Sequence, residues 1–550
     1  MKNRLKCISL PCIFKLMAKA SKRKNIKKNI ESAPIKVEKT DHVKDTFYEN
    51  FIYMIIIAIL FLGVYGFIFD KKLDLNGDNA YYYMLGKALS QGEGYVNIAD
   101  INKSPNNHYP PGYPFILSLF MHISDSIIFL KLINGIFLLL SLYLLYYLFK
   151  YFSQSPKIAF VTVFFLLLNS HLLLYGTMLM SEISFILLSF FCIYLVHNAD
   201  LENNIFRKPH LYLILITLVA SYYIRSTGLA LFGGLILYFL FNKYWKAAVF
   251  ISTGFIALAI PWIIRGQKLG GSSYIKPLVM INPYRAELGN ADTADYFNRI
   301  IANVSRYITR EIPNSNLPFI KVNYLSEIGS LEWLIGIPVL LIIVYGLYKL
   351  GRRGLIIICY LVTTFGILLL WPEVWSGVRF VLPVVPLLFF GLIIGTYNGM
   401  NYILKSFKTK ARFNILILMV FGLTFITPIQ AIHLKAKTDY PNAWKNYFSV
   451  AGWFKRNNIK DAVVICRKPM LFHINSGTYT SNFKYSKDEK EILDDLNNKQ
   501  TDYVILDNLG YRQTYEYLFP AINNHKENFK MVFKLENPDT YLLKYNSTIE

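Results

Sequence analysis

Charged residues and cysteines are both scarce in this chain of 550 residues. Asp, Glu, Lys and Arg make up 17% of it, whereas soluble domains contain about a quarter. Hydrophobic residues make up 54% and the mean hydropathy is +0.34, which excludes a disordered chain and an ordinary cytosolic enzyme. The five cysteines form no Cys-x-x-Cys pair and no metal-like spacing, so we expect neither a disulfide scaffold nor a zinc site.

Acidic residues are also few, 35 against 58 basic ones, and the formal net charge is +23. Such a charge is typical of nucleic-acid-binding proteins, so its position in the chain decides its meaning. Residues 1–50 hold thirteen bases and five acids. Thirteen more bases and two acids lie in short loops between apolar runs, near residues 150–157, 200–208, 243–246, 349–353 and 405–412. These segments would share the cytoplasmic side under the positive-inside rule. The basic charge is then a sign of membrane topology, so we expect no nucleic-acid partner.

Long apolar runs predict a chain that crosses the membrane many times. A bilayer core about 30 Å thick needs roughly 20 apolar residues in a helix. We expect about eleven spans, near residues 51–69, 126–149, 158–175, 183–197, 211–226, 227–241, 247–264, 333–349, 355–371, 379–396 and 413–430. The protein would lie in the cytoplasmic (plasma) membrane with its N-terminus on the cytoplasmic side. The C-terminus and two long loops, 70–125 and 265–332, would then lie on the outer side.

The fold class expected is an all-α polytopic membrane protein with a small C-terminal α/β domain. Its parts would be a basic cytoplasmic tail (1–50), a transmembrane domain (51–430) and a soluble extracytoplasmic domain (431–550). In the last part polar residues return, and β-rich runs at 462–465 and 503–506 alternate with helix-like stretches. We expect no signal peptide, because the N-terminus has no long apolar region followed by a small-residue cleavage site.

Within the second long loop, apolar residues recur at helical spacing. They are Phe297, Ile300, Ile301, Val304 and Ile308. Such a pattern in a loop outside the membrane predicts a helix that lies on the membrane surface.

Five sequence elements follow one another at the predicted outer ends of the spans. They are Gly-Asp-x-x-x-Tyr at 77–82, Tyr-Pro-Pro-x-Tyr-Pro at 109–114, Met-Ser-Glu at 180–182, Tyr-Ile-Arg-Ser-Thr-Gly at 223–228 and Ser-Gly-Val-Arg-Phe-Val-Leu-Pro at 376–383. The first two stand in the 70–125 loop. A loop of this length is usually functional or disordered, and this one is too aromatic to be disordered.

These elements resemble those of the membrane glycosyltransferases of the GT-C fold, in the same order and over roughly residues 50–480. The most similar branch is the bacterial aminoarabinose-transferase and protein-mannosyltransferase type. The resemblance implies transfer of a sugar from a polyprenyl phosphate donor in the membrane to an acceptor hydroxyl on the extracytoplasmic face. Glycan, lipid and protein acceptors all stay open. The aminoarabinose branch often has a basic residue beside its Pro-Pro pair, and His108-Tyr109 stand there instead, so that branch's substrate does not carry over.

By this resemblance Asp78 is the catalytic carboxylate, which removes the acceptor proton for an inverting attack on the anomeric carbon. A carboxylate just outside the bilayer, beside apolar walls, should also have its pKa raised towards useful base strength. The alternative is an Asx-type turn after Asn76-Gly77.

Arg225 and Arg379 are the candidate ligands of the carrier phosphate, because a guanidinium at the membrane edge is costly unless it is paired and its planar fork suits a phosphate. The alternative is snorkelling to the headgroups. Glu182 is expected to orient the acceptor or to pair with Arg225, unless it only caps a helix.

Tyr82, His108 and Tyr109 are further candidate substrate-binding residues, with an aromatic surface loop as the alternative. We expect no required cofactor. Related oligosaccharyltransferases suggest a divalent cation shared by Asp74, Asp78 and Glu182, but no ligand spacing supports it.

Two other functions stay open. A lipid-linked polysaccharide polymerase or ligase would place its large outer loop late in the chain. A transporter or flippase would have inverted repeats and ionisable groups near mid-membrane.

Overall fold

The computed structural model describes residues 40–202, 204–270, 275–285, 288–406 and 412–547. Residues 1–51 and 52–550 form two compact units. Of the first unit only residues 40–51 are described, and they begin helix α2. The predicted basic tail therefore lies mostly outside the described residues, as does part of the basic loop at 405–412.

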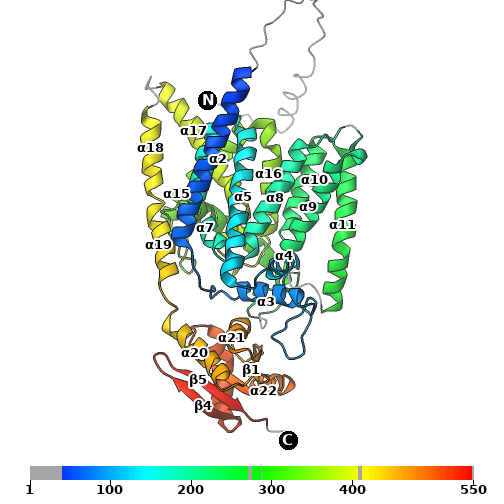
Figure 1. Cartoon of the computed structure of the whole chain (residues 1–550), viewed down its shortest axis with the longest axis vertical. Helices are drawn as coiled ribbons and strands as arrows, with labels where there is room; N and C mark the ends of the chain where they lie inside the picture. The colour runs from blue at the N-terminus through cyan, green and yellow to red at the C-terminus, as the bar shows by residue number, and fades with distance from the viewer. Residues whose placement is uncertain (1–39, 203, 271–274, 286–287, 407–411, 548–550) are drawn as a thin grey trace, which may run out of the picture. The chain divides into compact units, whose positions relative to one another are not determined.

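Helices dominate the chain up to residue 437 (Figure 1). They are α2 (Thr40–Ile68), α3 (Asp78–Ser90), α4 (Gly112–Met121), α5 (Ile127–Ser153), α6 (Pro156–Leu167), α7 (Ser170–Gly176), α8 (Ser181–Asn198), α9 (Pro209–Ile224), α10 (Gly228–Phe241), α11 (Trp245–Lys268), α12 (Ile275–Val279), α13 (Thr293–Arg306), α14 (Ile312–Asn316), α15 (Ser330–Lys349), α16 (Leu355–Leu368), α17 (Val385–Ser406), α18 (Arg412–Leu423) and α19 (Ile426–Lys437). Short helical turns lie at Ile205–Arg207, Tyr307–Glu311, Gly351–Gly354, Val378–Phe380 and Leu382–Val384.

Eight described helical stretches are long and apolar enough to cross a membrane, or nine if α6 and α7, which meet at 62°, form one broken span. The predicted multi-pass fold is thus confirmed, with fewer long spans than the eleven expected. The shorter apolar helices α9 and α10 fall on the other two predicted spans. They are short because the chain turns sharply between them, where the N–H of Gly228 donates to the carbonyl of Arg225 (2.8 Å).

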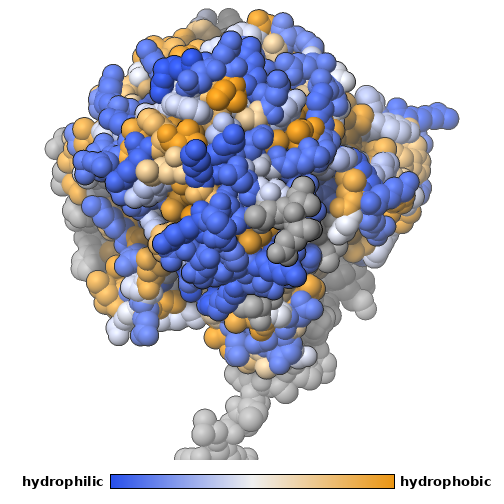
Figure 2. All heavy atoms as spheres, turned by 90° about the horizontal axis from the view of Figure 1, so that it is seen from below, coloured by the Kyte–Doolittle hydropathy of each residue, from blue (hydrophilic) through white to orange (hydrophobic). Residues whose placement is uncertain are grey.

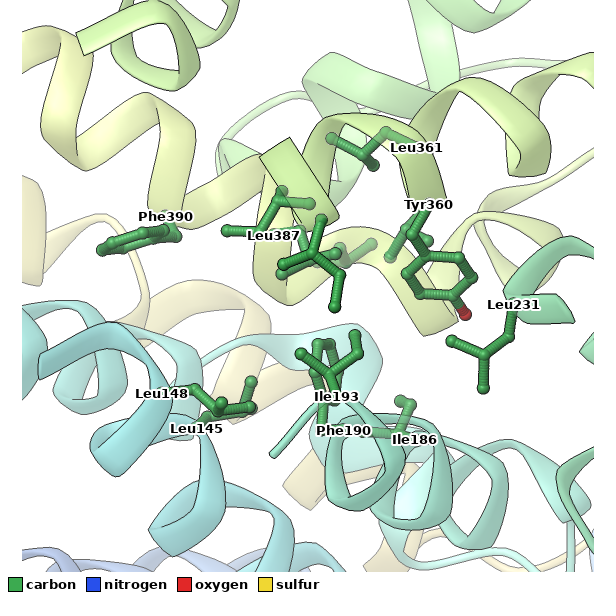
Figure 3. Packing of buried hydrophobic residues seen from close by; sticks show 14 of the residues in the cluster. Leu145, Leu148, Ile186, Phe190, Ile193, Leu231, Tyr360, Leu361, Leu387 and Phe390 are labelled. Atoms are coloured by element: carbon green, nitrogen blue, oxygen red, sulfur yellow. The ribbon is translucent and has the colours of Figure 1, made fainter. Parts of the chain in front are cut away.

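The core between these helices consists of aliphatic and aromatic side chains. Figure 3 shows Leu145 and Leu148 of α5, Ile186, Phe190 and Ile193 of α8, Leu231 of α10, Tyr360 and Leu361 of α16, and Leu387 and Phe390 of α17. Helices α15 and α17 cross with their backbones in contact. A Cβ at Gly346 would lie 1.9 Å from the carbonyl oxygen of Gly391. Glycine is therefore required at this crossing, as is common where membrane helices pack closely.

The C-terminal domain is built on one five-stranded sheet, in the order β2-β1-β3-β5-β4. Its strands are β1 (Val463–Ile465), β2 (Tyr479–Ser481), β3 (Tyr503–Leu506), β4 (Phe529–Leu535) and β5 (Thr540–Tyr545), and its helices are α20 (Asn442–Arg456), α21 (Pro469–Ser476), α22 (Glu489–Asn498) and α23 (Phe519–Asn524). Strands β2, β1 and β3 run parallel, with Val464 paired to Thr480 on one side and to Tyr503 on the other. Strand β5 is antiparallel to both β3 and β4. This is the predicted small α/β domain.

The C-terminal domain packs against the segment between α2 and α4. The Tyr440 hydroxyl donates to the carbonyl of Leu73 (2.8 Å), and the N–H of Thr480 donates to that of Ala99 (2.7 Å). Residues of both regions belong to one buried apolar cluster. The face seen from this end of the molecule is mainly hydrophilic (Figure 2). Because of these contacts, the C-terminal domain covers the loop that carries the Gly-Asp-x-x-x-Tyr element.

Candidate active site

Asp78 is the first residue of α3. Gly77 before it has φ +102°, a conformation that favours glycine. The predicted alternative, an Asx-type turn at Asp78, is not what the structure has. It is Asp74 whose carboxylate accepts the N–H two residues ahead, from Asn76 (2.9 Å). The side chain of Asp78 is left to point into the network described next.

The Tyr-Pro-Pro-x-Tyr-Pro element places Tyr109 against this carboxylate. The Tyr109 hydroxyl donates to Asp78 Oδ1 (2.9 Å). Gly112 lies directly on the end of α9, because a Cβ there would come within 2.7 Å of the carbonyl group of Tyr223. This close approach brings the element beside Arg225, the residue that follows α9.

An ion network joins four predicted residues from distant parts of the chain. Arg379 donates through Nη1 to Asp78 Oδ2 (2.6 Å) and through Nε to Glu182 Oε1 (2.6 Å). Arg225 Nη1 lies 2.7 Å from the same oxygen of Glu182. Glu182 is fully buried, whereas the side chain of Arg379 is 22% exposed. The carboxylate that the sequence left as a possible helix cap is therefore the common partner of both arginines.

Tyr82 joins the network through Ser181, which sequence analysis did not name as a candidate site residue. Its hydroxyl lies 3.2 Å from Ser181 Oγ, and this oxygen also accepts a hydrogen bond from Arg225 Nη1 (3.0 Å). Ser181 is fully buried. Its place in the Met-Ser-Glu element, directly before Glu182, was the available signal.

The electrostatics of Asp78 differ from the prediction. Burial alone would raise the pKa of its carboxyl, but the charge of Arg379 and hydrogen bonds from Arg379 and Tyr109 outweigh burial, so the pKa lies below its ordinary value. The expectation of a raised pKa was wrong, because the sequence did not show that Arg379 lies against the carboxylate. Conversely, Glu182 and Asp78 raise the pKa of Arg379, although burial opposes this, so the guanidinium stays charged.

A cavity of about 430 Å³ lies over the network. Its lining includes six predicted residues: Asp78, Tyr82, His108, Tyr109, Arg225 and Arg379. Trp371 and Trp375 form part of its wall. His108 is exposed, and its ring packs edge-on against that of Tyr109 at 4.6 Å.

A second cavity of about 460 Å³ lies beside the first, and Trp371 and Trp375 line both. Its other walls are mainly apolar side chains of α10 and α11, among them Phe232, Phe255 and Ile263. A polar, charged cavity thus lies next to an apolar one, and the two share part of their walls.

The carboxylates proposed for a divalent cation are otherwise engaged. Asp74 pairs with Lys435 (3.2 Å), and Arg379 lies between Asp78 and Glu182. Among the described residues, no group of three or more His, Cys, Asp or Glu side chains is arranged as a metal site. An arginine between the two carboxylates does not fit a cation shared by them.

No family model and no curated protein matches the sequence, but the fold is similar to that of solved structures. The archaeal oligosaccharyltransferase AglB from Archaeoglobus fulgidus, in complex with an inhibitory peptide and a dolichol-phosphate, aligns with a TM-score of 0.54 and 12% identity, over 92% of this chain and 75% of its own. ArnT from Cupriavidus metallidurans bound to undecaprenyl phosphate gives 0.55 and 10% identity, over 90% of this chain and 98% of its own, and its apo state gives 0.54. Both are glycosyltransferases of the GT-C fold. The chain therefore has the GT-C fold, as its sequence elements predicted.

Proposed function

We propose that the chain is an integral-membrane glycosyltransferase, which moves a sugar from a polyprenyl phosphate donor to an acceptor hydroxyl on the extracytoplasmic face. The observation that carries the proposal is the pair of adjacent cavities, one lined by two arginines and a carboxylate and the other mainly apolar. A polyprenyl phosphate sugar has the same two halves. Its isoprene chain suits the groove along α10 and α11, and its phosphate suits the arginines. AglB and ArnT are solved with dolichol-phosphate and undecaprenyl phosphate, which supports this donor class.

In this mechanism the donor phosphate binds Arg225 and Arg379 and replaces Asp78 as a partner of Arg379. The pKa of Asp78 then rises, because the guanidinium that lowers it is shared with the phosphate. The acceptor oxygen attacks the anomeric carbon while its proton moves to Asp78. The bond between that carbon and the phosphate oxygen breaks, and polyprenyl phosphate leaves with its new negative charge facing the two arginines. Tyr109 keeps the carboxylate in place through its hydrogen bond.

The orientation rests on the basic loops at the other ends of the helices. Arg352 donates to the side chain of Asn242 (3.3 Å), and Lys150 and His197 line one pocket, so these loops gather at common ends of the bundle. Their positive charge favours the cytoplasm. The site at the start of α3, at the opposite ends of the helices, would then face outside.

The test is sugar transfer in membranes from a panel of radiolabelled polyprenyl phosphate sugars, with Asp78→Asn compared with wild type. Asp74→Asn is the matched control, because Asp74 stands in the same loop but does not line the cavity. We expect transfer by wild type and Asp74→Asn, and a loss of at least about 10²-fold in Asp78→Asn. Full activity in Asp78→Asn would move the base elsewhere, with Glu182 next. Labelled lipid or sugar that crosses the bilayer without transfer would favour a transporter.

A further inference from the structure

The turn at residues 369–377, which leads into Arg379, is held by buried polar side chains of α13. Asn303 donates to the carbonyls of Leu369 (3.0 Å) and Trp371 (2.8 Å). Arg306 donates to those of Glu373 (2.5 Å) and Trp375 (3.4 Å). One face of α13 thus fixes the backbone of the turn that contains Trp371 and Trp375, two residues of the cavity wall.

Glu311 connects this face to Arg379 itself. It lies in the helical turn after α13 and is fully buried. Its Oε1 forms an ion pair with Arg306, 2.8 Å from Nε, and accepts a hydrogen bond from the N–H of Gly377 (3.2 Å), two residues before Arg379. Gly377 has φ +115°, so the chain turns at this point in a way few other residues allow.

Helix α13 is turned with its polar side towards the protein. Arg299, Asn303 and Arg306 are buried, whereas Phe297 and Ile301 are 64% and 50% exposed. Burying arginine and asparagine is costly unless they are hydrogen-bonded. Asn303 and Arg306 donate to backbone carbonyls of the 369–377 turn. Arg299 donates to Leu370 in that turn and also to Leu278 and Met280, so this face holds the turn together with the end of α12.

We infer that Glu311 and Arg306 are positioning residues for the donor site. They set the 369–377 turn so that the guanidinium of Arg379 lies between Asp78 and Glu182 and the two tryptophans form the cavity wall. Neither Glu311 nor Arg306 lines the cavity, so both act through Arg379. The inference rests on the proposed function for the identity of the ligand, a polyprenyl phosphate.

The matched control is Glu332. It also pairs with an arginine, accepting from Arg310 Nε (3.1 Å), and with a backbone N–H, that of Gly329 (2.6 Å), and neither partner lies in the 369–377 turn. Glu311→Gln and Glu332→Gln therefore each remove one charge that pairs with an arginine and a backbone N–H, although Glu332 is 28% exposed and Glu311 is fully buried. Thermal unfolding of both full-length variants reports any general loss of stability.

Two measurements decide the role of Glu311. The first is hydrogen–deuterium exchange of the ligand-free protein in nanodiscs. Glu311→Gln should raise exchange of the 369–380 amides at least tenfold, and Glu332→Gln should leave it unchanged. The second is binding of undecaprenyl phosphate to wild type, Glu311→Gln, Arg379→Gln and the double variant. Glu311→Gln should weaken binding about tenfold in the wild type and have no further effect once Arg379 is replaced.

Unchanged exchange at 369–380 in Glu311→Gln would overturn the inference, whatever the ligand. Additive losses in the double variant would also overturn it, because Glu311 would then act independently of Arg379. If wild type binds no undecaprenyl phosphate, the proposed function fails, and the exchange measurement still decides whether Glu311 holds the turn.

Discussion

The carboxylate of Asp78 and the guanidinium of Arg379 lie 2.6 Å apart, although 301 positions separate them in the chain. The same guanidinium contacts Glu182, which in turn pairs with Arg225. An aspartate held in this way is a weak base until another anion occupies Arg379. Under the proposed function, the donor phosphate is that anion, so binding of the donor and activation of the base are one event.

Replacing Tyr109 with Phe should shift the pH dependence of the reaction. The Tyr109 hydrogen bond helps to lower the pKa of Asp78, so its loss raises that pKa. A base works only when deprotonated, so the acidic limb of kcat/KM against pH should move to higher pH. Tyr113→Phe is the control, since the Tyr113 hydroxyl has no hydrogen-bond partner among the described residues. A limb that stays in place in Tyr109→Phe would argue against Asp78 as the base.

Glu182→Gln should destabilise the protein markedly. Glu182 is fully buried between Arg225 and Arg379, and its loss of charge leaves two guanidinium groups without their shared counter-charge. Breaking a buried pair in this way costs on the order of 3 kcal/mol. Thermal unfolding in nanodiscs measures the effect, with Glu93→Gln, from an exposed pair with Lys103, as the comparison. An equal change in the two variants would contradict the buried network.

Lys468 of the C-terminal domain should affect the site without lining it. Its Nζ donates to the carbonyl of Asn76 (2.9 Å), next to Gly77 at the start of α3. Lys468→Met removes that contact, so the turn before Asp78 loosens and kcat should fall about tenfold or more. Binding of undecaprenyl phosphate should change little, because Arg225 and Arg379 are untouched. Lys468→Arg should restore part of kcat, and an equal loss of donor binding in Lys468→Met would refute this assignment.

Asp507 should make the stability of the C-terminal domain depend on pH. Burial raises the pKa of this carboxyl to about 6, above about 3.9 in an unfolded chain. The folded state thus holds the proton more tightly, and stability should fall as pH rises from about 4 to about 6.

Asp507→Asn removes this dependence and should stabilise the protein at pH 7.5 by on the order of 1 kcal/mol. The difference in Tm between pH 5 and pH 7.5 checks it, with the exposed Asp461→Asn as control. A Tm for Asp507→Asn below that of wild type at pH 7.5 would show that the charged carboxylate is stabilising.

Local patterns predicted the helical fold and singled out residues that the structure brings together around one cavity. The apolar runs located the spans, since lipid leaves a helix as the only option for such segments. The helix predicted around Phe297 and Ile301 is α13, and its position on the membrane surface stays a prediction. The α9–α10 turn was less accessible to sequence reasoning, because its geometry depends on Gly228 lying against Tyr222.

The electrostatics of the site were beyond sequence reasoning. Whether a carboxylate near the membrane has a raised or a lowered pKa depends on its partner, and Arg379 approaches Asp78 only through the packing of distant segments. No motif in the sequence pointed to the positioning roles inferred for Arg306 and Glu311 either. Their partners are carbonyls and an N–H of the 369–377 turn, and such groups are the same in every sequence.

The exposed apolar side of α13 ties the donor site to its surroundings. Phe297 and Ile301 are 64% and 50% exposed in the described structure, and if α13 lies on the membrane surface as predicted, we expect acyl chains and headgroups to cover them. The same helix fixes the turn that carries Arg379. Under the proposed function, lipid is then a structural component of the site, and its removal by detergent should loosen Arg379, the proposed phosphate ligand. Preparations that keep a bilayer should therefore bind the donor more tightly than the same protein in micelles.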